Sequence, residues 1–311
     1  MSHPSSASTD VPERGTASPR KIRYPLAIIG AGALGLGFAA RLSRSVPVAV
    51  IARNEARAGA LRAGVRVGEA HYHADAFAPE HAPEADWVIV LVKAGDTTDA
   101  GRIAAAMRPR GVLSLQNGLT EAMLRAGAGD PSAQRLVAQG ITTEGAFRDD
   151  SGVTPSGAGE TLVPAGFEAV AELLACAGFR ARVEPDIVAA RLAKLLVNVA
   201  INPLAAIFRV TNGALLEPPY RIYLDALVRE AWPVLNAEGL LLDEAAAHAR
   251  VVAVAAATGA NRASMLQDVL AGRPTEIDAI TGALLDMAQR HRIETPTHRA
   301  MLALIKLHDE P

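Results

Sequence analysis

Three polar side chains recur every four residues in an otherwise apolar segment. The segment R-L-A-K-L-L-V-N-V-A-I-N-P places Lys194, Asn198 and Asn202 at i, i+4 and i+8. On a helix these positions fall within an arc of about 80° and form one polar stripe. Burying a lysine and two asparagines is costly without partners, so a partly wet cleft beside the helix is the economical interpretation. A stripe that faces solvent, or asparagines bonded to backbone, is the alternative.

A second group of polar residues lies near the C-terminus, in N-R-A-S-M-L-Q-D-V-L-A-G-R-P-T-E-I-D. Asn261, Ser264 and Glu276 are candidates there, but each also has a plain structural interpretation. Ser264 with Gln267 fits an S-x-x-Q capping box, and Glu276 is expected in the first turn of a helix after Pro274, where an acid interacts well with the dipole. Spacing alone favours the structural roles for Ser264 and Glu276.

A glycine-rich turn indicates a dinucleotide site. The run PLAII leads into GAGALG at 30–35 and then into the helical pattern GFAARLSR. Gly30 permits the tight turn, Gly32 lets the backbone approach a pyrophosphate, and Gly35 allows the helix to pack closely on the strand. We count Leu34 in the same loop among the cofactor-binding residues. A glycine-rich turn that binds nothing is the alternative.

Polar residues also end three later predicted strands. The strand VPVAVIA ends at Arg53, where an NAD enzyme usually carries an acid for the ribose hydroxyls. An arginine there can form a bidentate interaction with a 2′-phosphate, which favours NADP over NAD, and Arg57 is a possible second contact. The alternative is that Arg53 is an ordinary exposed arginine. Lys93 and Asn117 end the runs VIVLVK and LSLQN, at the sheet edge where ligands bind. The Lys93 charge needs a partner, whereas Asn117-Gly118 could be a turn-forming pair.

Hydrophobic periodicity predicts an α/β chain with an N-terminal Rossmann-type parallel sheet followed by an all-α domain. From residue 24 to about 186, short strand-like runs alternate with Ala-rich helical stretches. From 187 onward the period becomes helical. The predicted helices are 187–208, 218–239, 243–258 and 275–292. We therefore expect a disordered tail at 1–23, an NADP-binding domain at 24–186 and a helical substrate and catalytic domain at 187–311.

Composition narrows the class of protein. The 31 basic and 33 acidic residues nearly cancel, so no global field attracts nucleic acid or an anionic membrane. No apolar run reaches the ~20 residues that span a bilayer. The single cysteine, Cys176, cannot form an internal disulfide, which fits a cytoplasmic protein. We expect no metal site, because the eight histidines show no ligand spacing, and His71 and His73 are expected to flank an exposed strand.

These segments together resemble the ketopantoate reductase family over residues 24 to about 307. The resemblance is carried by GAGALG at 30–35, VK at 92–93, QNG at 116–118, K-x3-N-x3-NP at 194–203, and SMLQD followed by TEID at 264–278. It implies a Rossmann-type domain followed by a helical domain, with NADPH reducing 2-dehydropantoate to pantoate, a coenzyme A precursor, in the cleft between them.

The resemblance also implies residue roles. Lys194 matches the catalytic lysine that donates a proton or hydrogen bond to the carbonyl oxygen, and Glu276 matches an acid near that oxygen. The residue types fit this chemistry, because hydride addition builds negative charge on the carbonyl oxygen, which a nearby ammonium stabilises and then neutralises by proton transfer. Asn and Ser side chains can bind a carboxylate and a hydroxyl without carrying net charge. The substrate-binding matches are Asn198, Asn202, Ser264 and, as an additional contact, Asn261. The cofactor-side matches are Lys93 and Asn117 beside the cofactor and Arg53 at the 2′-phosphate.

Other readings stay open. The family often has a Trp two residues before the catalytic lysine, where this chain has Leu192. Family members with such differences include paralogues that reduce another branched or hydroxylated 2-oxo acid. A further alternative is a related 2- or 3-hydroxyacid dehydrogenase. A protein that only senses NADP is a less favoured alternative. The expected partner is a small 2-oxo acid, with a homodimer as an option by analogy.

Overall fold

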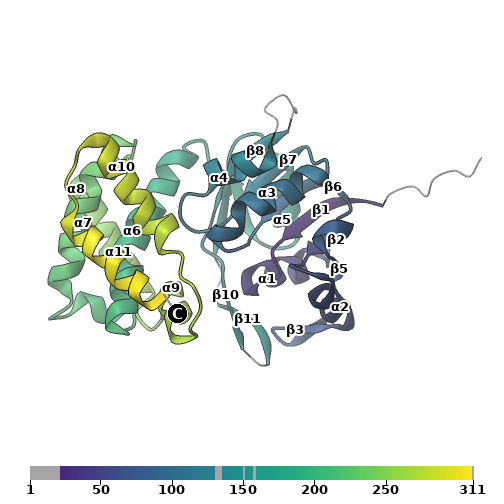
Figure 1. Ribbon diagram of the computed structural model, residues 1–311, viewed down its shortest axis with the longest axis horizontal. Helices are drawn as coiled ribbons and strands as arrows, with labels where there is room; N and C mark the ends of the chain where they lie inside the picture. The colour runs from purple at the N-terminus through teal and green to yellow at the C-terminus, as the bar shows by residue number, and fades with distance from the viewer. Residues whose placement is uncertain (1–21, 130–134, 150, 157–158, 310–311) are drawn as a thin grey trace, which may run out of the picture.

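A six-stranded parallel sheet forms the centre of the N-terminal half (Figure 1). The computed structural model describes residues 22–129, 135–149, 151–156 and 159–309. The strand order is β5-β2-β1-β6-β7-β8, and each neighbouring pair is parallel. The strands are β1 (Arg23–Ile29), β2 (Val48–Ile51), β5 (Asp75–Phe77), β6 (Glu84–Val90), β7 (Gly111–Ser114) and β8 (Leu136–Gln139). The order changes direction next to β1, so the carboxyl ends of β1 and β6 flank the place where open α/β sheets bind ligands.

Helices cover both faces of this sheet, which explains why its strands are almost continuously apolar. One face packs against α1 (Ala33–Leu42), α2 (Glu55–Ala63) and α5 (Glu168–Cys176). The other face packs against α3 (Thr97–Ala106) and α4 (Glu121–Ala128). Two short 3-10 turns, η1 (Pro79–His81) and η2 (Ala94–Asp96), lie in the connections before and after β6.

Two smaller sheets are additions to this plan. A four-stranded sheet has the order β10-β11-β3-β4, and a three-stranded sheet has the order β13-β12-β9. Their strands are β3 (Val65–Val67), β4 (Ala70–Tyr72), β9 (Ile141–Thr142), β10 (Gly145–Asp149), β11 (Gly152–Ser156), β12 (Glu160–Val163) and β13 (Arg180–Val183). The apolar run RLVAQGIT at 135–142 reads as one strand in the sequence, but it is divided at Gly140, where a Cβ would lie 2.5 Å from the Leu162 carbonyl oxygen. As a result β8 and β9 belong to different sheets.

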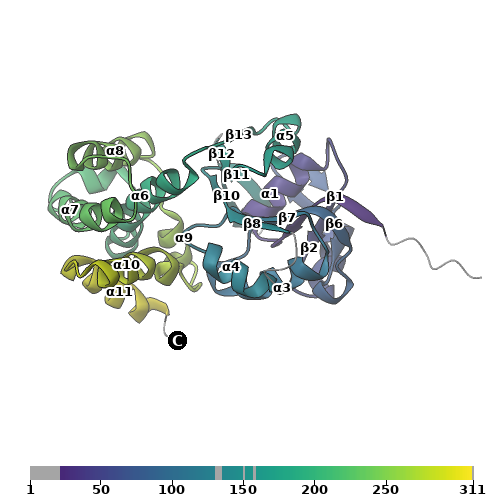
Figure 2. The same cartoon turned by 90° about the horizontal axis from the view of Figure 1, so that it is seen from above.

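The second half is helical, as predicted, and begins with α6 (Ile187–Phe208), whose bounds match the predicted helix. It continues through η3 (Gly213–Leu216), α7 (Arg221–Ala237), α8 (Glu244–Ala257), α9 (Ser264–Leu270), the π-helical turn η4 (Asp278–Gly282), α10 (Ala283–His291) and α11 (Pro296–Asp309). Helices α9 and α11 are additional to the predicted four, and the helix expected from 275 starts later, through η4. Figure 2 shows this helical bundle beside the sheet domain, with α6 leading from one to the other.

Helix α6 is the core of the bundle. Among the described residues it is the one helix long and apolar enough to cross a membrane by length and composition, but 56% of its apolar window is buried inside the protein. Its buried residues pack with those of α7, α8, α10 and α11 in a single cluster. Burial in this cluster accounts for its apolar composition.

Most of the predicted N-terminal tail, residues 1–21, lies outside the described residues. Arg23 was expected in that tail but is the first residue of β1. Its guanidinium donates to Asp86 at 2.9 Å and to Glu84 at 3.0 Å, which fixes the start of the strand against β6.

Candidate active site

The glycine loop after β1 has the geometry that a dinucleotide requires. Gly30 has φ +119°, and a Cβ there would lie 2.6 Å from the Leu91 carbonyl. A Cβ on Gly35 would lie 1.9 Å from the Gly30 oxygen, so α1 packs directly on the loop. Around Gly32 there is open space, and this N-cap residue of α1 has no side chain to bond the first amides of the helix. The free amides and the open backbone fit a pyrophosphate.

The end of β2 carries the two arginines predicted for the 2′-phosphate. Arg53 is exposed directly after the strand, and Arg57 lies in the first turn of α2, where the Asn54 side chain caps the helix by accepting from the Arg57 amide at 2.9 Å. The Nη2 atom of Arg57 is buried and has no hydrogen-bond partner in the structure. A buried guanidinium nitrogen with no partner among the described residues is available to bind an anion, so these residues fit the 2′-phosphate of NADP.

Lys194 extends from α6 into the junction of the two domains. Its Nζ donates to the Asn117 Oδ1 at 3.0 Å and to the Thr142 carbonyl oxygen at 2.8 Å. Burial lowers the pKa of Lys194 to about 8, and the opposing charge of Glu276 acts in the other direction. The ammonium is thus held beside the carboxyl end of β7 with its proton poised for release near neutral pH.

Glu276 reaches the same junction from the segment before η4. It is 8% exposed, its Oε2 accepts from the Asn117 Nδ2 at 3.3 Å, and its Oε1 accepts from the Ala94 amide at 3.3 Å. Asn117 therefore bridges Lys194 and Glu276. Three residues that are distant in the sequence, and that were all singled out from it, meet in one cluster.

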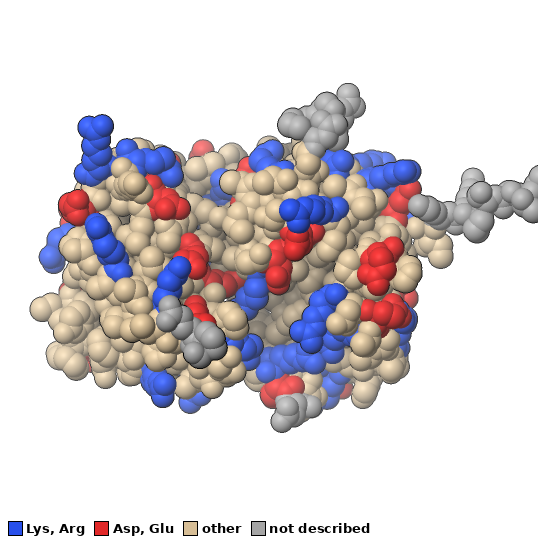
Figure 3. Space-filling view, viewed as in Figure 1, with Lys and Arg blue, Asp and Glu red and all other residues tan. Residues whose placement is uncertain are grey.

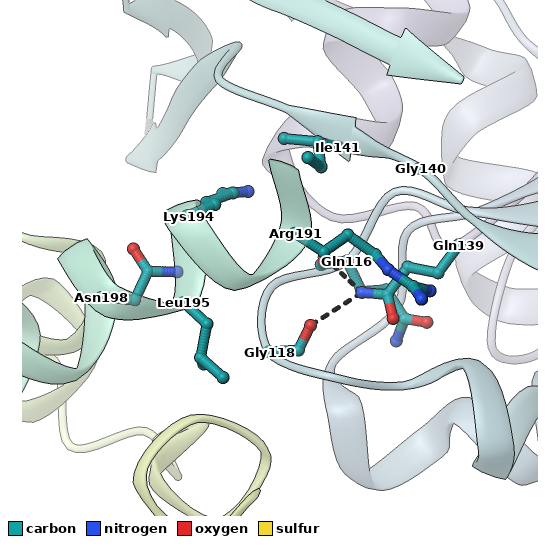
Figure 4. A pocket seen from close by; sticks show the side chains of 9 residues that line it. All are labelled: Gln116, Gly118, Gln139, Gly140, Ile141, Arg191, Lys194, Leu195 and Asn198. Carbon is teal, nitrogen blue, oxygen red and sulfur yellow. Dashed lines mark hydrogen bonds between the residues drawn. The ribbon is translucent and has the colours of Figure 1, made fainter. Parts of the chain in front are cut away.

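A narrow pocket adjoins Lys194 (Figure 4). Asn198 lines it one helical turn after Lys194, and both side chains extend from the same side of α6. Gln139 borders it and donates through its Nε2 to the Gly118 oxygen at 2.7 Å, which holds the turn after β7 in place. The Lys194 end of the polar stripe therefore faces the sheet domain, because its ammonium is bonded across the junction, whereas Asn202, two turns later, is buried at 7% exposure and does not line this pocket.

Lys93 has a partner in the other domain. Its Nζ lies 2.5 Å from the Asp268 Oδ2, and the Oδ1 of that carboxylate accepts from the Arg273 Nε at 3.1 Å. Asp268 is 4% exposed, whereas half of the Lys93 side chain is exposed. The charge at the end of β6 is therefore paired across the junction.

The remaining predicted residues are less closely connected. Asn261 and Ser264 are exposed, and in the described part of the chain no side-chain hydrogen bond joins Asn202, Asn261 or Ser264 to Lys194. Two structural interpretations of this segment were wrong. Ser264 does not cap α9, since the N-cap is Ala263 without a side-chain bond, and Glu276 precedes the helix instead of lying in its first turn.

Comparison with protein families identifies the chain. The model described as "Ketopantoate reductase PanE/ApbA" matches residues 26–165, and the model described as "Ketopantoate reductase PanE/ApbA C terminal" matches residues 186–309. The chain belongs to the ketopantoate reductase family. The predicted fold class is confirmed by the parallel sheet and the helical C-terminal part.

Relatives and solved structures agree with this assignment. The 2-dehydropantoate 2-reductase of Archaeoglobus fulgidus is 34% identical over 290 residues, which cover 90% of this chain and 96% of the relative. The corresponding protein of Halobacterium salinarum is 36% identical over 74% of this chain and 78% of its own length. The crystal structure of probable 2-dehydropantoate 2-reductase from Bacillus subtilis matches with a TM-score of 0.75 and 30% identity, covering 92% of this chain and all of that one.

D-mandelate dehydrogenase in a ternary structure with NADH and anilino(oxo)acetate shares the fold, with a TM-score of 0.82 and 22% identity over 93% of this chain and 98% of that one.

Several contacts of this ketopantoate reductase family member had little or no signal in the sequence. Asp268 lies inside SMLQD, and nothing in the sequence indicates that its carboxylate forms a salt bridge with Lys93. The Thr142 contribution is a backbone oxygen, which any residue could supply. Arg191 lines the pocket one turn before Lys194 and pairs with Glu121 of α4. Its position on the same face of α6, at i−3 from Lys194, was the one available clue.

Proposed function

We propose that this chain catalyses the NADPH-dependent reduction of 2-dehydropantoate to pantoate, a step toward coenzyme A. The observation that carries the proposal is the Lys194–Asn117–Glu276 cluster at the junction between a dinucleotide-binding sheet domain and a helical domain. Family membership and the names of relatives such as the Archaeoglobus fulgidus protein support the same reaction.

Each member of the cluster has a role that follows from its contacts. NADPH, when bound, supplies the hydride. Lys194 is proposed to give its proton to the carbonyl oxygen, because a buried ammonium stabilises charge that develops there. Glu276 keeps that ammonium charged by its opposite charge, and Asn117 fixes the direction of both side chains. We propose Asn198, Asn202, Ser264 and Asn261 as substrate ligands.

We propose that the residues that bind the cofactor lie in the glycine loop after β1 and at the ends of the neighbouring strands. Gly30, Gly32, Leu34 and Gly35 would hold the pyrophosphate at the α1 N-terminus, and Arg53 would hold the 2′-phosphate. Lys93 and Asn117 lie at the carboxyl ends of β6 and β7, beside the position that this arrangement leaves for the rest of the cofactor.

We also propose the domain division, the location and the assembly. The domain boundary is placed between Asp186 and Ile187, where α6 begins. A cytoplasmic location agrees with the single free cysteine, Cys176. A homodimer is proposed because a ketopantoate reductase from Staphylococcus aureus is described as dimeric.

The deciding experiment follows NADPH oxidation with purified protein and a panel of 2-oxo acids, each repeated with NADH. We expect fastest turnover with 2-dehydropantoate and NADPH. Ketoisovalerate, which lacks the terminal hydroxymethyl group, is the matched comparison, and we expect it to react at least tenfold more slowly in kcat/KM. Faster turnover of another 2-oxo acid would overturn the substrate but keep the reaction class. Absence of turnover with retained NADPH binding would overturn the enzymatic proposal.

A further inference from the structure

The four-stranded sheet β10-β11-β3-β4 has no counterpart in the parallel plan of the cofactor domain, yet it lies against α1, the helix that follows the cofactor loop. Val153 of β11 is 1% exposed and belongs to the core cluster of α1 and α2, and Val67 of β3 packs against that cluster. A Cβ on Gly37 of α1 would lie 4.0 Å from the Ala146 Cβ of β10. One face of this sheet is therefore its inner face, directed at α1 and α2.

The strand register places an arginine on that inner face. Arg148 is paired with Val153, and Val153 is paired with Val67. Directly paired residues project to the same side of a sheet, and so do residues two apart on one strand. Arg148 is paired with an inward residue and is also two residues after Ala146, so its side chain extends on the side of α1 and α2.

Arg148 meets other arginines there. Burial lowers the pKa of the Arg57 guanidinium, and the positive charges of Arg148 and then Arg53 lower it further. The three side chains come from different elements, namely the hairpin β10–β11, the first turn of α2 and the end of β2. Figure 3 shows Lys and Arg side chains gathered over the region in which Figure 1 places β11, β3 and α1.

No acidic side chain neutralises this group. Among the residues that the structure describes, no salt bridge includes Arg53, Arg57 or Arg148; the nearby carboxylates are engaged elsewhere, Glu55 with Arg62 and Asp149 with the Ser151 amide at 2.8 Å. The Nη2 atom of Arg57 is at the same time buried without a partner. Three converging guanidinium groups and an unsatisfied buried donor form a receptor for an anion of high charge.

We propose that Arg148 completes, with Arg53 and Arg57, a three-arginine receptor for the phosphate monoester on the adenosine 2′-oxygen of the cofactor. The inference rests on the proposed use of NADPH and deepens it, because it assigns the preference for NADPH over NADH to a hairpin outside the Rossmann plan. A phosphate monoester carries close to two negative charges at neutral pH. Several guanidinium groups, each able to donate two parallel hydrogen bonds, match this charge.

The test compares the binding of NADPH and NADH to wild type and to R148A, by titrating the fluorescence of the reduced nicotinamide. We expect R148A to raise the Kd for NADPH by roughly tenfold or more and to leave the Kd for NADH within about twofold, because the lost charge-assisted bond reaches only the 2′-phosphate. R148K should retain part of the preference. R102A is the matched control, since it removes an exposed arginine of α3 that is paired with Asp99.

A second probe isolates the phosphate from the rest of the cofactor. Adenosine 2′-monophosphate should compete with NADPH better than adenosine 5′-monophosphate in wild type, and R148A should reduce this advantage about tenfold. Equal changes in both cofactor Kd values, or an unchanged NADPH preference in R148A, would overturn the role of Arg148. A wild type that binds NADPH and NADH equally would instead overturn the proposed cofactor.

Discussion

The proton that we propose is transferred in the reaction belongs to Lys194, and the properties of this ammonium follow from the atoms around it. The ammonium donates to Asn117 and to a backbone oxygen, and burial brings its pKa to about 8. An ordinary exposed lysine holds its proton too tightly to deliver it to an alkoxide at neutral pH with the best efficiency. The same burial that costs free energy in the folded protein therefore serves the reaction.

The pH dependence of the reaction tests this environment. Because Lys194 must be protonated for reduction, we expect kcat/KM to be constant below about pH 8 and to fall about tenfold per pH unit above it. The reverse oxidation, which needs the neutral amine, should rise up to pH 8. Stopped-flow measurement between pH 6 and 10 gives the first profile from NADPH oxidation by the 2-oxo acid and the second from NADP reduction by pantoate.

Two variants complete the measurement. K194A should lower kcat by about 10² to 10⁴, the usual contribution of a positioned acid, with the NADPH Kd within about twofold of wild type. The arginine of K194R stays charged over this pH range, so the fall in kcat/KM above pH 8 should be absent in this variant, whatever its absolute rate. A wild-type profile that is flat to pH 10 would contradict the role of Lys194.

At the residue level, the sequence predicted best which site residues lie together where their spacing alone puts them on one face of a helix. Lys194, Asn198 and Asn202 could be grouped from their period of four alone. The bridge from Asn117 to Glu276 spans 159 positions, and the pair of Lys93 with Asp268 spans 175. Such pairs depend on how two domains meet, which no local pattern encodes.

At the level of elements, the long regular segments were predictable and the short ones were not. Helix α6 has 22 residues with a clear period, and its bounds were predicted without error. The strands β3 and β4 have three residues each and are mostly exposed or half-buried, so they carry neither an apolar run nor a clean alternation. Helix α9, with seven residues, is too short for a helical period to show.

Helix α11 contains a histidine whose burial should govern stability in mild acid. His298 is fully buried, and its Nε2 lies 2.9 Å from the Leu227 oxygen of α7. Burial lowers its pKa to about 4. Between pH 6.5 and 4 the unfolded chain binds a proton that the folded protein does not, so the free energy of unfolding falls as the pH is lowered.

We expect a loss of about 2 kcal/mol from this group between pH 7 and pH 5, measured by urea denaturation. H298Q, which can still donate to the Leu227 oxygen, should remove most of that dependence. H308Q, at an exposed position of the same helix, should leave it intact. If H298Q and wild type lose stability in parallel, another group is responsible.

On the scale of the whole molecule, the turn after β7 is a point where the two domains are joined by a backbone–backbone hydrogen bond. The Leu119 amide donates to the Ala279 oxygen of η4 at 3.1 Å. Gly118 has φ +72°, and a Cβ there would lie 2.2 Å from that same oxygen. The absence of a side chain at Gly118 therefore sets how closely the domains approach.

The structure offers a matched pair of glycines to test this contact. Gly129 also has φ +72°, but none of the described residues has an atom within 4 Å of a Cβ built on it. G118A and G129A both place alanine at a positive φ, whereas only G118A adds a collision between the domains. We expect G118A to lower kcat/KM by roughly 10², as a displacement of about 1 Å at the reacting groups would, and G129A to lower it less than threefold. If steady-state assays show equal losses of kcat/KM in G118A and G129A, backbone strain and not the contact between the domains is the cause.

Helix α6 starts immediately after the last strand of the sheet domain, so the element that tethers the domains is also the one that bears the proton donor. Lys194 lies seven residues along it, about 10 Å from the pivot at Ile187. A rotation of only ~10° about that pivot would swing the ammonium by ~2 Å, enough to switch the chemistry on or off. We therefore expect the helix to act as a lever arm: a rotation that opens the cleft to release the product would also move the proposed proton donor away from the reacting oxygen.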